Sequence, residues 1–170
     1  TSATIAKQYR KLLDKYASQT SSIPEFVDWQ GHDFSMRGMA GLEAAMISGA
    51  GHLLSFTGSD TIPVVDFLET YYNANSANEL VGGTVAATEH SVMCMGTNTG
   101  EQETFERLIT EVYPGGIVSI VSDTWDLWKV LTEYLPNLKE QVLARDGKVV
   151  IRPDSGDPVD IICGNPNGKH

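Results

Sequence analysis

A short apolar run that opens directly into a charged turn most constrains how this chain folds. Val149, Val150 and Ile151 form the run, and the segment 152–158 that follows reads R-P-D-S-G-D-P. A fully apolar run of this length is typical of a strand buried on both faces of a parallel sheet. Parallel sheets and barrels bind ligands at the carboxyl ends of their strands. The sequence therefore predicts a buried parallel strand that ends in a ligand site.

The same order of strand and helix recurs about five times along the chain, which predicts an α/β fold with a parallel sheet. Expected strands cover residues 32–37, 52–56, 84–87, 117–121 and 149–151. Expected helices cover residues 5–16, 42–48, 63–72, 89–95, 105–112, 125–131 and 138–143, with a last one from Pro158. A chain of 170 residues is enough for one domain with a real core, so a single α/β domain over residues 1–170 is expected.

Composition excludes several classes of protein. The net charge of −10 argues against nucleic-acid binding, which needs a basic face. No apolar run approaches the ~20 residues of a membrane-spanning helix, so no membrane partner is expected. The two cysteines, Cys94 and Cys163, are too few for a disulfide scaffold and have no metal-ligand spacing. A reduced, cytoplasmic protein without a cysteine metal site is expected.

Polar residues repeatedly follow the expected strands, which predicts that several strand ends meet in one pocket. They are Arg37, Asp60, Glu89, His90, Asp123, Arg152 and Asp154. Structural alternatives stay open for several of them. Asp60 and Asp123 could each cap a following helix, and a lone histidine such as His90 is more often structural than catalytic. Phe34 and the tryptophans Trp125 and Trp128 are expected in the core.

Arg152 and Asp154 favour function over structure. Two charges beside a buried strand are costly unless each finds a partner, and they could satisfy each other. An arginine also stacks on aromatic rings and binds phosphates through its planar fork. No nucleophile–base motif, phosphate-binding Walker loop or zinc spacing accompanies them. The residues alone thus predict an α/β ligand-binding domain whose ligand is an anion.

Five segments carry a more specific resemblance. They read H-D-F-S-M-R-G at 32–38, F-T-G-S-D-T at 56–61, A-A-T-E-H-S at 86–91, V-S-D-T-W-D at 121–126 and I-R-P-D-S-G-D-P at 151–158. In this order and spacing, the chain resembles the nicotinamide phosphoribosyltransferase family over nearly its whole length. Each segment is weak by itself, whereas five in register are specific.

The resemblance implies an activity, a fold and an assembly. Members of that family transfer the phosphoribosyl group of phosphoribosyl pyrophosphate to nicotinamide, which gives nicotinamide mononucleotide and pyrophosphate in NAD salvage. The implied fold is an irregular, TIM-like α/β barrel of the type II phosphoribosyltransferases, with active sites at a homodimer interface. The implied cofactors are Mg²⁺, bound with phosphoribosyl pyrophosphate, and ATP as an activating phosphate donor.

The resemblance also implies roles for individual residues around the base. Phe34 and Arg152 would sandwich the nicotinamide ring, and Asp60 would accept a hydrogen bond from its carboxamide. A carboxylate at Asp60 would repel nicotinate and so set specificity by charge. Thr84 and Ser119 would lie near the nicotinamide pocket.

At the other end of the substrate, Arg37 would bind phosphate, while Asp123 and Asp154 would hold the ribose, the metal or the pyrophosphate. His90 matches the histidine that ATP phosphorylates in the family. The resemblance thus implies catalytic roles for His90 and Asp154.

Family members are far longer than this chain, so a fragment with an incomplete barrel and little turnover by itself is expected. Two alternatives stay open. The substrate could be nicotinate, which Asp60 argues against, or the chain could be a non-catalytic binding or interaction module on the same fold.

Overall fold

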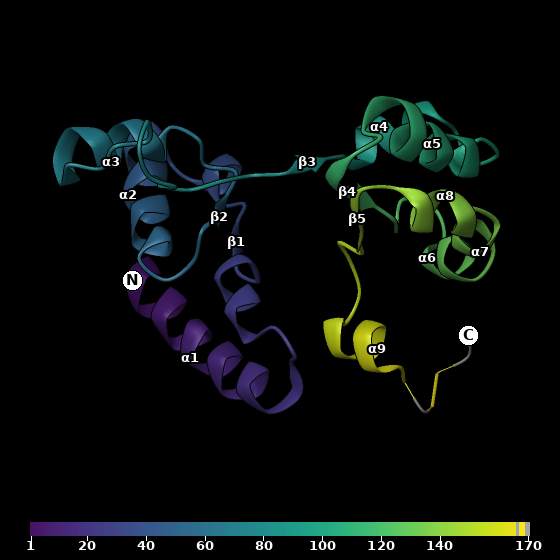
Figure 1. Ribbon diagram of the computed structural model, residues 1–170, viewed down its shortest axis with the longest axis horizontal. Helices are drawn as coiled ribbons and strands as arrows, with labels where there is room; N and C mark the ends of the chain where they lie inside the picture. The colour runs from purple at the N-terminus through teal and green to yellow at the C-terminus, as the bar shows by residue number, and fades with distance from the viewer. Residues whose placement is uncertain (166, 169–170) are drawn as a thin grey trace. The chain divides into compact units, whose positions relative to one another are not determined.

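The computed structural model describes residues 1–165 and 167–168. Contacts within the chain gather into two compact units, Thr1–Thr84 and Val85–His170 (Figure 1). Both units combine helices with short parallel strands, which confirms the expected α/β class. The expectation of a single domain over the whole chain stays a prediction.

The first unit places two short strands among helices. It contains α1 (Ser2–Thr20), the 3-10 helix η1 (Pro24–Trp29), β1 (His32–Asp33), the 3-10 helix η2 (Met36–Gly38), α2 (Leu42–Leu53), β2 (Gly58–Ser59) and α3 (Val64–Tyr72). Strands β1 and β2 are parallel, with His32 opposite Gly58 and Asp33 opposite Ser59. A further parallel bridge joins Gly58 to Gly83. The carboxyl ends of these segments therefore lie together.

The strand expected at residues 52–56 is wrong, because α2 continues to Leu53 and the strand begins only at Gly58. Apolar residues in this stretch serve a helix end and the core instead. Phe56 is 4 % exposed and belongs to a cluster with Ala6, Ala17 and Val27. Its neighbour His52 stacks on it, with ring centroids 5.1 Å apart. A short apolar run does not by itself distinguish a strand from a buried helix end.

The second unit is built on a three-stranded parallel sheet in the order β3-β4-β5. Its elements are β3 (Ala86–Ala87), α4 (His90–Met95), α5 (Glu101–Arg107), the π-helical turn η3 (Leu108–Val112), β4 (Gly116–Val121), α6 (Leu127–Lys129), the π-helical turn η4 (Val130–Tyr134), α7 (Leu135–Asn137), α8 (Lys139–Ala144), β5 (Gly147–Arg152) and α9 (Pro158–Cys163). The core packs around the central strand β4, whose Val118, Ile120 and Val121 are fully buried together with Phe105 and Met93.

Strand β5 is not buried on both faces, which corrects the first expectation from sequence. Within the described part of the chain, β5 is an edge strand that pairs only with β4, from Gly147 opposite Gly116 to Arg152 opposite Val121. Val150 keeps 40 % of its surface exposed. The apolar run therefore predicted a parallel strand correctly, but it did not predict that the strand lies at the edge of the sheet.

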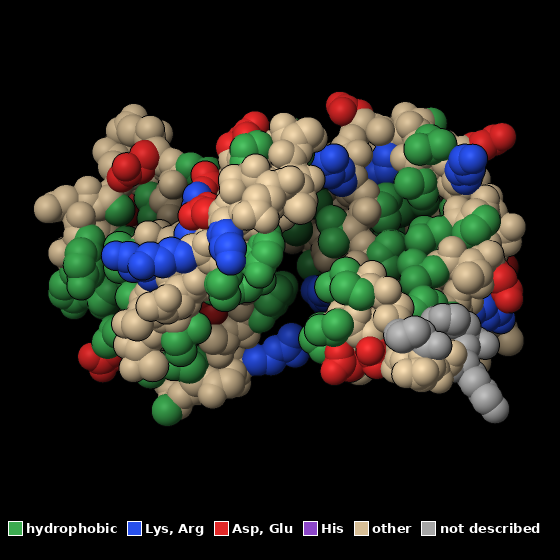
Figure 2. Space-filling view, turned by 90° about the horizontal axis from the view of Figure 1, so that it is seen from below, with side chains coloured by type: hydrophobic (Ala, Val, Ile, Leu, Met, Phe, Trp, Pro, Cys, Tyr) green, Lys and Arg blue, Asp and Glu red, His purple; other side chains and the backbone are tan. Residues whose placement is uncertain are grey.

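Several aromatic residues expected in the core lie at the surface. Phe34 is 44 % exposed, Trp125 43 % and Trp128 40 %. Figure 2 shows hydrophobic side chains among charged ones on the face that it presents. Among the described residues, no helix has both the length and the apolar character needed to cross a membrane.

Candidate functional site

In the first unit, Asp60 is the centre of a polar cluster just after β2. His32 Nε2 lies 2.8 Å from Asp60 Oδ1, and the Thr84 hydroxyl donates to the same oxygen at 2.5 Å. The Asp60 amide donates to the Asp33 carbonyl at 2.9 Å. The alternative that Asp60 caps the next helix is wrong, because α3 has Pro63 at its N-cap and no side-chain cap. The carboxylate is thus held by residues from β1 and from the end of the unit.

Asp33 supports this cluster from the opposite face of β1. It is 8 % exposed, and its Oδ2 accepts hydrogen bonds from the Ser59 hydroxyl at 3.2 Å and the Thr61 hydroxyl at 2.8 Å. Burial opposes ionisation of Asp33, but hydrogen bonds from Ser35 and Thr61 outweigh it and lower the pKa of the carboxyl. An ionised, fully bonded Asp33 therefore fastens the loop after β2 to β1.

Phe34 and Arg37 follow β1 and face outward. The Phe34 ring lies 4.6 Å from the His32 ring, centroid to centroid, at an interplanar angle of 39°. It is 44 % exposed, so the ring lies at the surface. Arg37 lies in η2 and is exposed. An aromatic ring and a cation thus follow His32, a member of the Asp60 cluster, within five residues of the chain.

In the second unit, His90 lies between two carboxylates that follow neighbouring strands. His90 Nε2 is 3.3 Å from Asp123 Oδ1, and His90 Nδ1 is 3.9 Å from Asp154 Oδ2. The His90 side chain is 47 % exposed and the Asp154 side chain is 55 % exposed. His90 is the first residue of α4, just after β3. The three strand ends of this sheet therefore bring together an accessible imidazole and two acidic groups.

Asp123 is the anchored member of this cluster. Its Oδ2 accepts from the Asp154 amide at 2.9 Å and the Ser155 hydroxyl at 2.5 Å. Burial opposes its ionisation, but these hydrogen bonds and the nearby His90 outweigh it and lower the pKa of the carboxyl. Asp123 does not cap the next helix. Asp126 does so, accepting from the amides of Trp128 and Lys129.

Arg152 ends β5 and reaches across the sheet. Its Nη2 donates to the Thr88 carbonyl at 2.6 Å, and the Thr88 hydroxyl accepts from the Val121 amide at 3.0 Å. Ser119 lies in β4 opposite Ala87, is 8 % exposed, and its carbonyl accepts from the Thr88 amide. The guanidinium is therefore tied to the loop after β3, beside the strand that carries Ser119.

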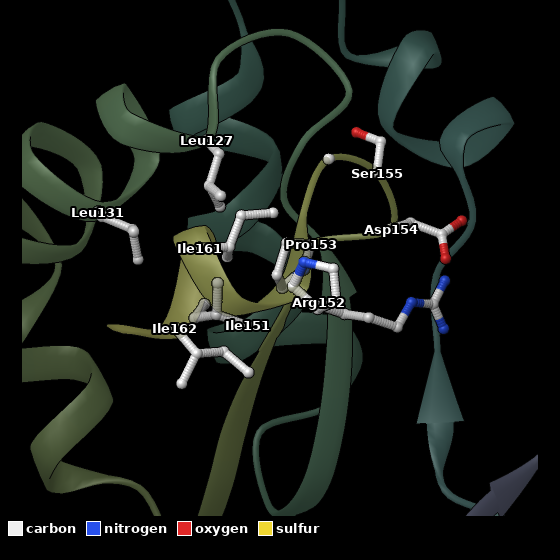
Figure 3. Close-up of a pocket in the computed structure, with 11 residues that line it drawn as sticks. Leu127, Leu131, Ile151, Arg152, Pro153, Asp154, Ser155, Ile161 and Ile162 are labelled. Atoms are coloured by element: carbon white, nitrogen blue, oxygen red, sulfur yellow. The ribbon is translucent and has the colours of Figure 1, made fainter. Parts of the chain in front are cut away.

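A groove of about 660 Å³ lies on the other side of the segment 151–156. Apolar side chains make most of its wall, among them Leu127, Leu131, Ile161 and Ile162. Figure 3 shows these apolar groups facing one another while the Arg152 and Asp154 side chains point away from them. Arg152 and Asp154 also line this groove, but their charged ends lie by the Thr88 carbonyl and by His90.

The structure brings the predicted residues together in two groups. Asp60 and Thr84 meet in the first unit, with Phe34 joined to them through His32; His90, Asp123 and Asp154 meet in the second. The sandwich of a ring between Phe34 and Arg152 stays a prediction, since the two residues belong to different units.

Three residues with clear parts in these clusters were not predicted: His32, Thr88 and Ser155. All three lie inside the five quoted segments, so the segments were a signal although no role was assigned to these positions. Among the described residues, no group of three or more His, Cys, Asp or Glu side chains forms a ready metal site.

Comparison with known proteins gives consistent results along the chain. The sequence profile of the nicotinate phosphoribosyltransferase (NAPRTase) family matches residues 29–165. A protein of Acinetobacter baylyi, named nicotinamide phosphoribosyltransferase, is 55 % identical over 99 % of this chain and 34 % of its own length. Proteins of the same name are 40 % identical in Mycoplasma pneumoniae (96 % of this chain, 33 % of theirs) and 34 % identical in Xanthomonas campestris (95 % and 34 %). The chain spans about a third of the length of these relatives.

Proposed function

Because the chain belongs to the nicotinate phosphoribosyltransferase family, we propose that it is the base-binding part of a nicotinamide phosphoribosyltransferase. In the proposed reaction, the bond between ribose C1 and pyrophosphate breaks and a bond to the nicotinamide ring nitrogen forms. The products are nicotinamide mononucleotide and pyrophosphate, as in NAD salvage. The names of the relatives support the substrate, and the geometry around Asp60 fits the role that the family resemblance implies for it.

The observation that carries this proposal is the held carboxylate of Asp60. His32 and Thr84 contact one of its oxygens, which leaves the other to accept from a ligand N–H. A carboxamide offers such an N–H, whereas the carboxylate of nicotinate would face a like charge. At about 4 Å and an effective dielectric constant near 20, two like charges repel by about 4 kcal/mol. This argument favours nicotinamide over nicotinate, the base in the family's name.

The ring of the base would pack on Phe34 and Arg152, a pairing that rests on the family resemblance. The exposed Phe34 ring offers an apolar plate, and a guanidinium stacks well on aromatic faces. Thr84 and Ser119 would border the same pocket. No side chain has to act as general base, since the lone pair of a pyridine nitrogen is already the nucleophile. The protein has only to orient the ring.

The phosphoribosyl end would use the acidic cluster and Arg37. Arg37 would bind phosphate by charge-assisted hydrogen bonds. Carboxylates and phosphate oxygens are the ligands that Mg²⁺ prefers, so Asp123 and the exposed Asp154 fit a magnesium ion that arrives with phosphoribosyl pyrophosphate. That ion would neutralise the charge of the leaving pyrophosphate. We place the catalytic role of Asp154 here.

His90 would accept the γ-phosphoryl group of ATP, with ADP as the leaving group. An imidazole must present an unprotonated nitrogen for this step. A carboxylate that holds one ring nitrogen as N–H leaves the other nitrogen with its lone pair. Asp123, whose Oδ1 lies 3.3 Å from Nε2, would favour the tautomer with its hydrogen on Nε2 and leave Nδ1 as the nucleophile, and the exposed position of His90 admits the nucleotide.

The longer protein would complete an irregular α/β barrel around these strands and would form a homodimer. Parallel strands with polar residues at their carboxyl ends support this fold. The chain spans about a third of its relatives, so we expect the 170-residue protein alone to show little turnover with nicotinamide, phosphoribosyl pyrophosphate, Mg²⁺ and ATP.

Equilibrium binding of the two bases tests the proposed substrate. We expect the 170-residue chain to bind nicotinamide more tightly than nicotinate in calorimetric or NMR titrations. Asp60→Asn should reduce that preference by roughly tenfold or more, since a hydrogen bond to a charged group is worth about 1.5–3 kcal/mol. Asp66→Asn removes an exposed carboxylate from α3 and should leave the preference unchanged. Binding of neither base by the wild-type chain would contradict the proposal.

A further inference from the structure

His32 and Asp60 meet because of the register of two parallel strands. His32 lies opposite Gly58, and Asp60 follows Gly58 by two residues. Residues two apart in a strand project to the same face, so the His32 ring and the Asp60 side chain share a face with Gly58 between them. The imidazole crosses over Gly58 and brings Nε2 to 2.8 Å from Asp60 Oδ1.

Gly58 gives the imidazole the space for this crossing. A Cβ atom at position 58 would lie 2.5 Å from His32 Nδ1 and 3.3 Å from Cγ and Cε1 of the same ring. Gly58 is not among the residues with a positive φ, so its backbone does not require glycine. The position therefore needs a glycine for the ring that lies on it, not for the path of the chain.

The contact defines which atoms of the cluster remain for a ligand. A carboxylate only accepts, so His32 Nε2 donates to Asp60 Oδ1. The Thr84 hydroxyl donates to the same oxygen, Oδ1. Among the described residues, none donates a hydrogen bond to the second oxygen, Asp60 Oδ2. The His32 ring also packs against the Phe34 ring. The His32 imidazole thus contacts both Asp60, the proposed acceptor for the carboxamide, and Phe34, on which the ring of the base is proposed to pack.

We propose that His32, seated on Gly58, is a positioning residue that orients Asp60 Oδ2 toward the base and so sets the preference for the amide over the acid. This inference rests on the proposed function. A carboxylate free to rotate could turn away from nicotinate and lose part of its repulsion. Because two donors hold Oδ1, the carboxylate cannot turn away, and its charge faces nicotinate as closely as it faces nicotinamide.

Variants of His32 separate its two contacts. In His32→Ala, both the affinity for nicotinamide and the nicotinamide-to-nicotinate ratio should fall, the ratio by roughly fivefold, the effect of one hydrogen bond. His32→Gln keeps a side-chain N–H donor of similar reach but loses the ring. We expect it to retain most of the ratio while nicotinamide affinity falls. Asp66→Asn, which alters an exposed side chain of α3, is again the control. It should leave the ratio unchanged.

Gly58→Ala tests the same idea without altering any polar group. The added methyl group should displace the imidazole and lower the ratio about as much as His32→Ala. In the double variant Gly58→Ala/His32→Ala, the methyl group has no ring to displace, so the second change should add little. Additive effects of the two substitutions would show that Gly58 does not act through His32 and would overturn the inference.

The outcomes distinguish this inference from the proposed function. If the wild-type chain prefers nicotinamide and Asp60→Asn reduces that preference, but His32→Ala does not, the function stands and the role of His32 falls. If the wild-type chain binds neither base, the function and the specificity claim both fall. The positioning contact then has its own test by ¹⁵N NMR of the imidazole. A hydrogen on Nε2 whose signal shifts in Asp60→Asn supports the contact, and a hydrogen on Nδ1 alone refutes it.

Discussion

Glu101 is the residue whose surroundings fit its usual charge least. It begins α5 with 1 % of its surface exposed, and within the described chain neither of its carboxylate oxygens has a hydrogen-bond partner. Burial raises the pKa of Glu101 to about 7; the nearby Asp126 adds to this, and Lys129 opposes it. A buried carboxylate without partners destabilises the fold when it ionises.

The raised pKa predicts a fold that loses stability as pH increases. Below the usual Glu pKa of 4.5, Glu101 is protonated in both the folded and the unfolded chain. As pH rises toward 7, the unfolded chain ionises first, and the free energy of unfolding falls. Glu101→Gln should remove this dependence. We expect the variant to be about 3 kcal/mol more stable than wild type at pH 8 and similar to it at pH 4.

Denaturant unfolding at the two pH values measures this effect. Glu103→Gln is the matched control, since Glu103 is an exposed carboxylate in the same helical turn. It should change the midpoint little at either pH. A Glu101→Gln variant with the same pH dependence as wild type would show that Glu101 is not the group responsible.

At the scale of single elements, two acidic residues before helix α6 have different structural roles: Asp126 caps the helix and Asp123 does not. In the segment V-S-D-T-W-D, the second aspartate, Asp126, caps the helix, with its Oδ1 accepting from Trp128 N at 3.0 Å and Lys129 N at 3.1 Å. The first, Asp123, is left to bind Ser155 and the Asp154 amide. An N-cap needs its side chain adjacent to the first turn, which only Asp126 satisfies.

Loss of this cap should weaken the second unit. We expect Asp126→Ala to lower the free energy of unfolding by about 1 kcal/mol, the usual cost of an N-cap deletion. Asp126→Asn can still accept from the same amides and should retain most of the stability. Thermal or chemical unfolding followed by far-ultraviolet circular dichroism measures both. Equal losses in the two variants would mean that the charge of Asp126, not its capping bond, stabilises the unit.

Sequence periodicity predicted most elements and their type, because it depends on residues close together in the chain. Helix α3, expected at 63–72, runs from Val64 to Tyr72, and β4, expected at 117–121, runs from Gly116 to Val121. The error at 52–56 arose where a helix end and a strand have the same short apolar signature. Helix α1 was also expected, but its inward residues are Ala6 and Ala17, while larger apolar residues on it are exposed.

At the scale of the whole molecule, exposed apolar surface predicts association. Helix α1 exposes a stripe at helical spacing, formed by Ile5, Tyr9, Leu12 and Tyr16, each between 47 % and 64 % exposed. Strand β5 also leaves one edge unpaired among the described residues. Contiguous apolar helix faces and open strand edges are both typical of surfaces that bind another chain.

We therefore expect the 170-residue protein to self-associate at micromolar concentration, as measured by light scattering or sedimentation. Leu12→Glu should reduce the association, because it places a charge in the centre of the stripe. Lys11→Gln changes the net charge by the same amount at an exposed, polar position and is the control. A monodisperse wild-type monomer across the concentration range would contradict the expectation.

The sequence by itself determined the α/β class, the parallel strands and the positions at which polar residues follow them. These features come from local periodicity and from residue types within a few positions of one another. Only the tertiary structure decided which polar residues meet. Asp60 is held by His32 and Thr84, 28 and 24 residues away in the chain, and Asp123 by Ser155, 32 residues away. The contact between His32 and Asp60 depends on the register of β1 against β2, which places His32 opposite Gly58 and which no local pattern reveals.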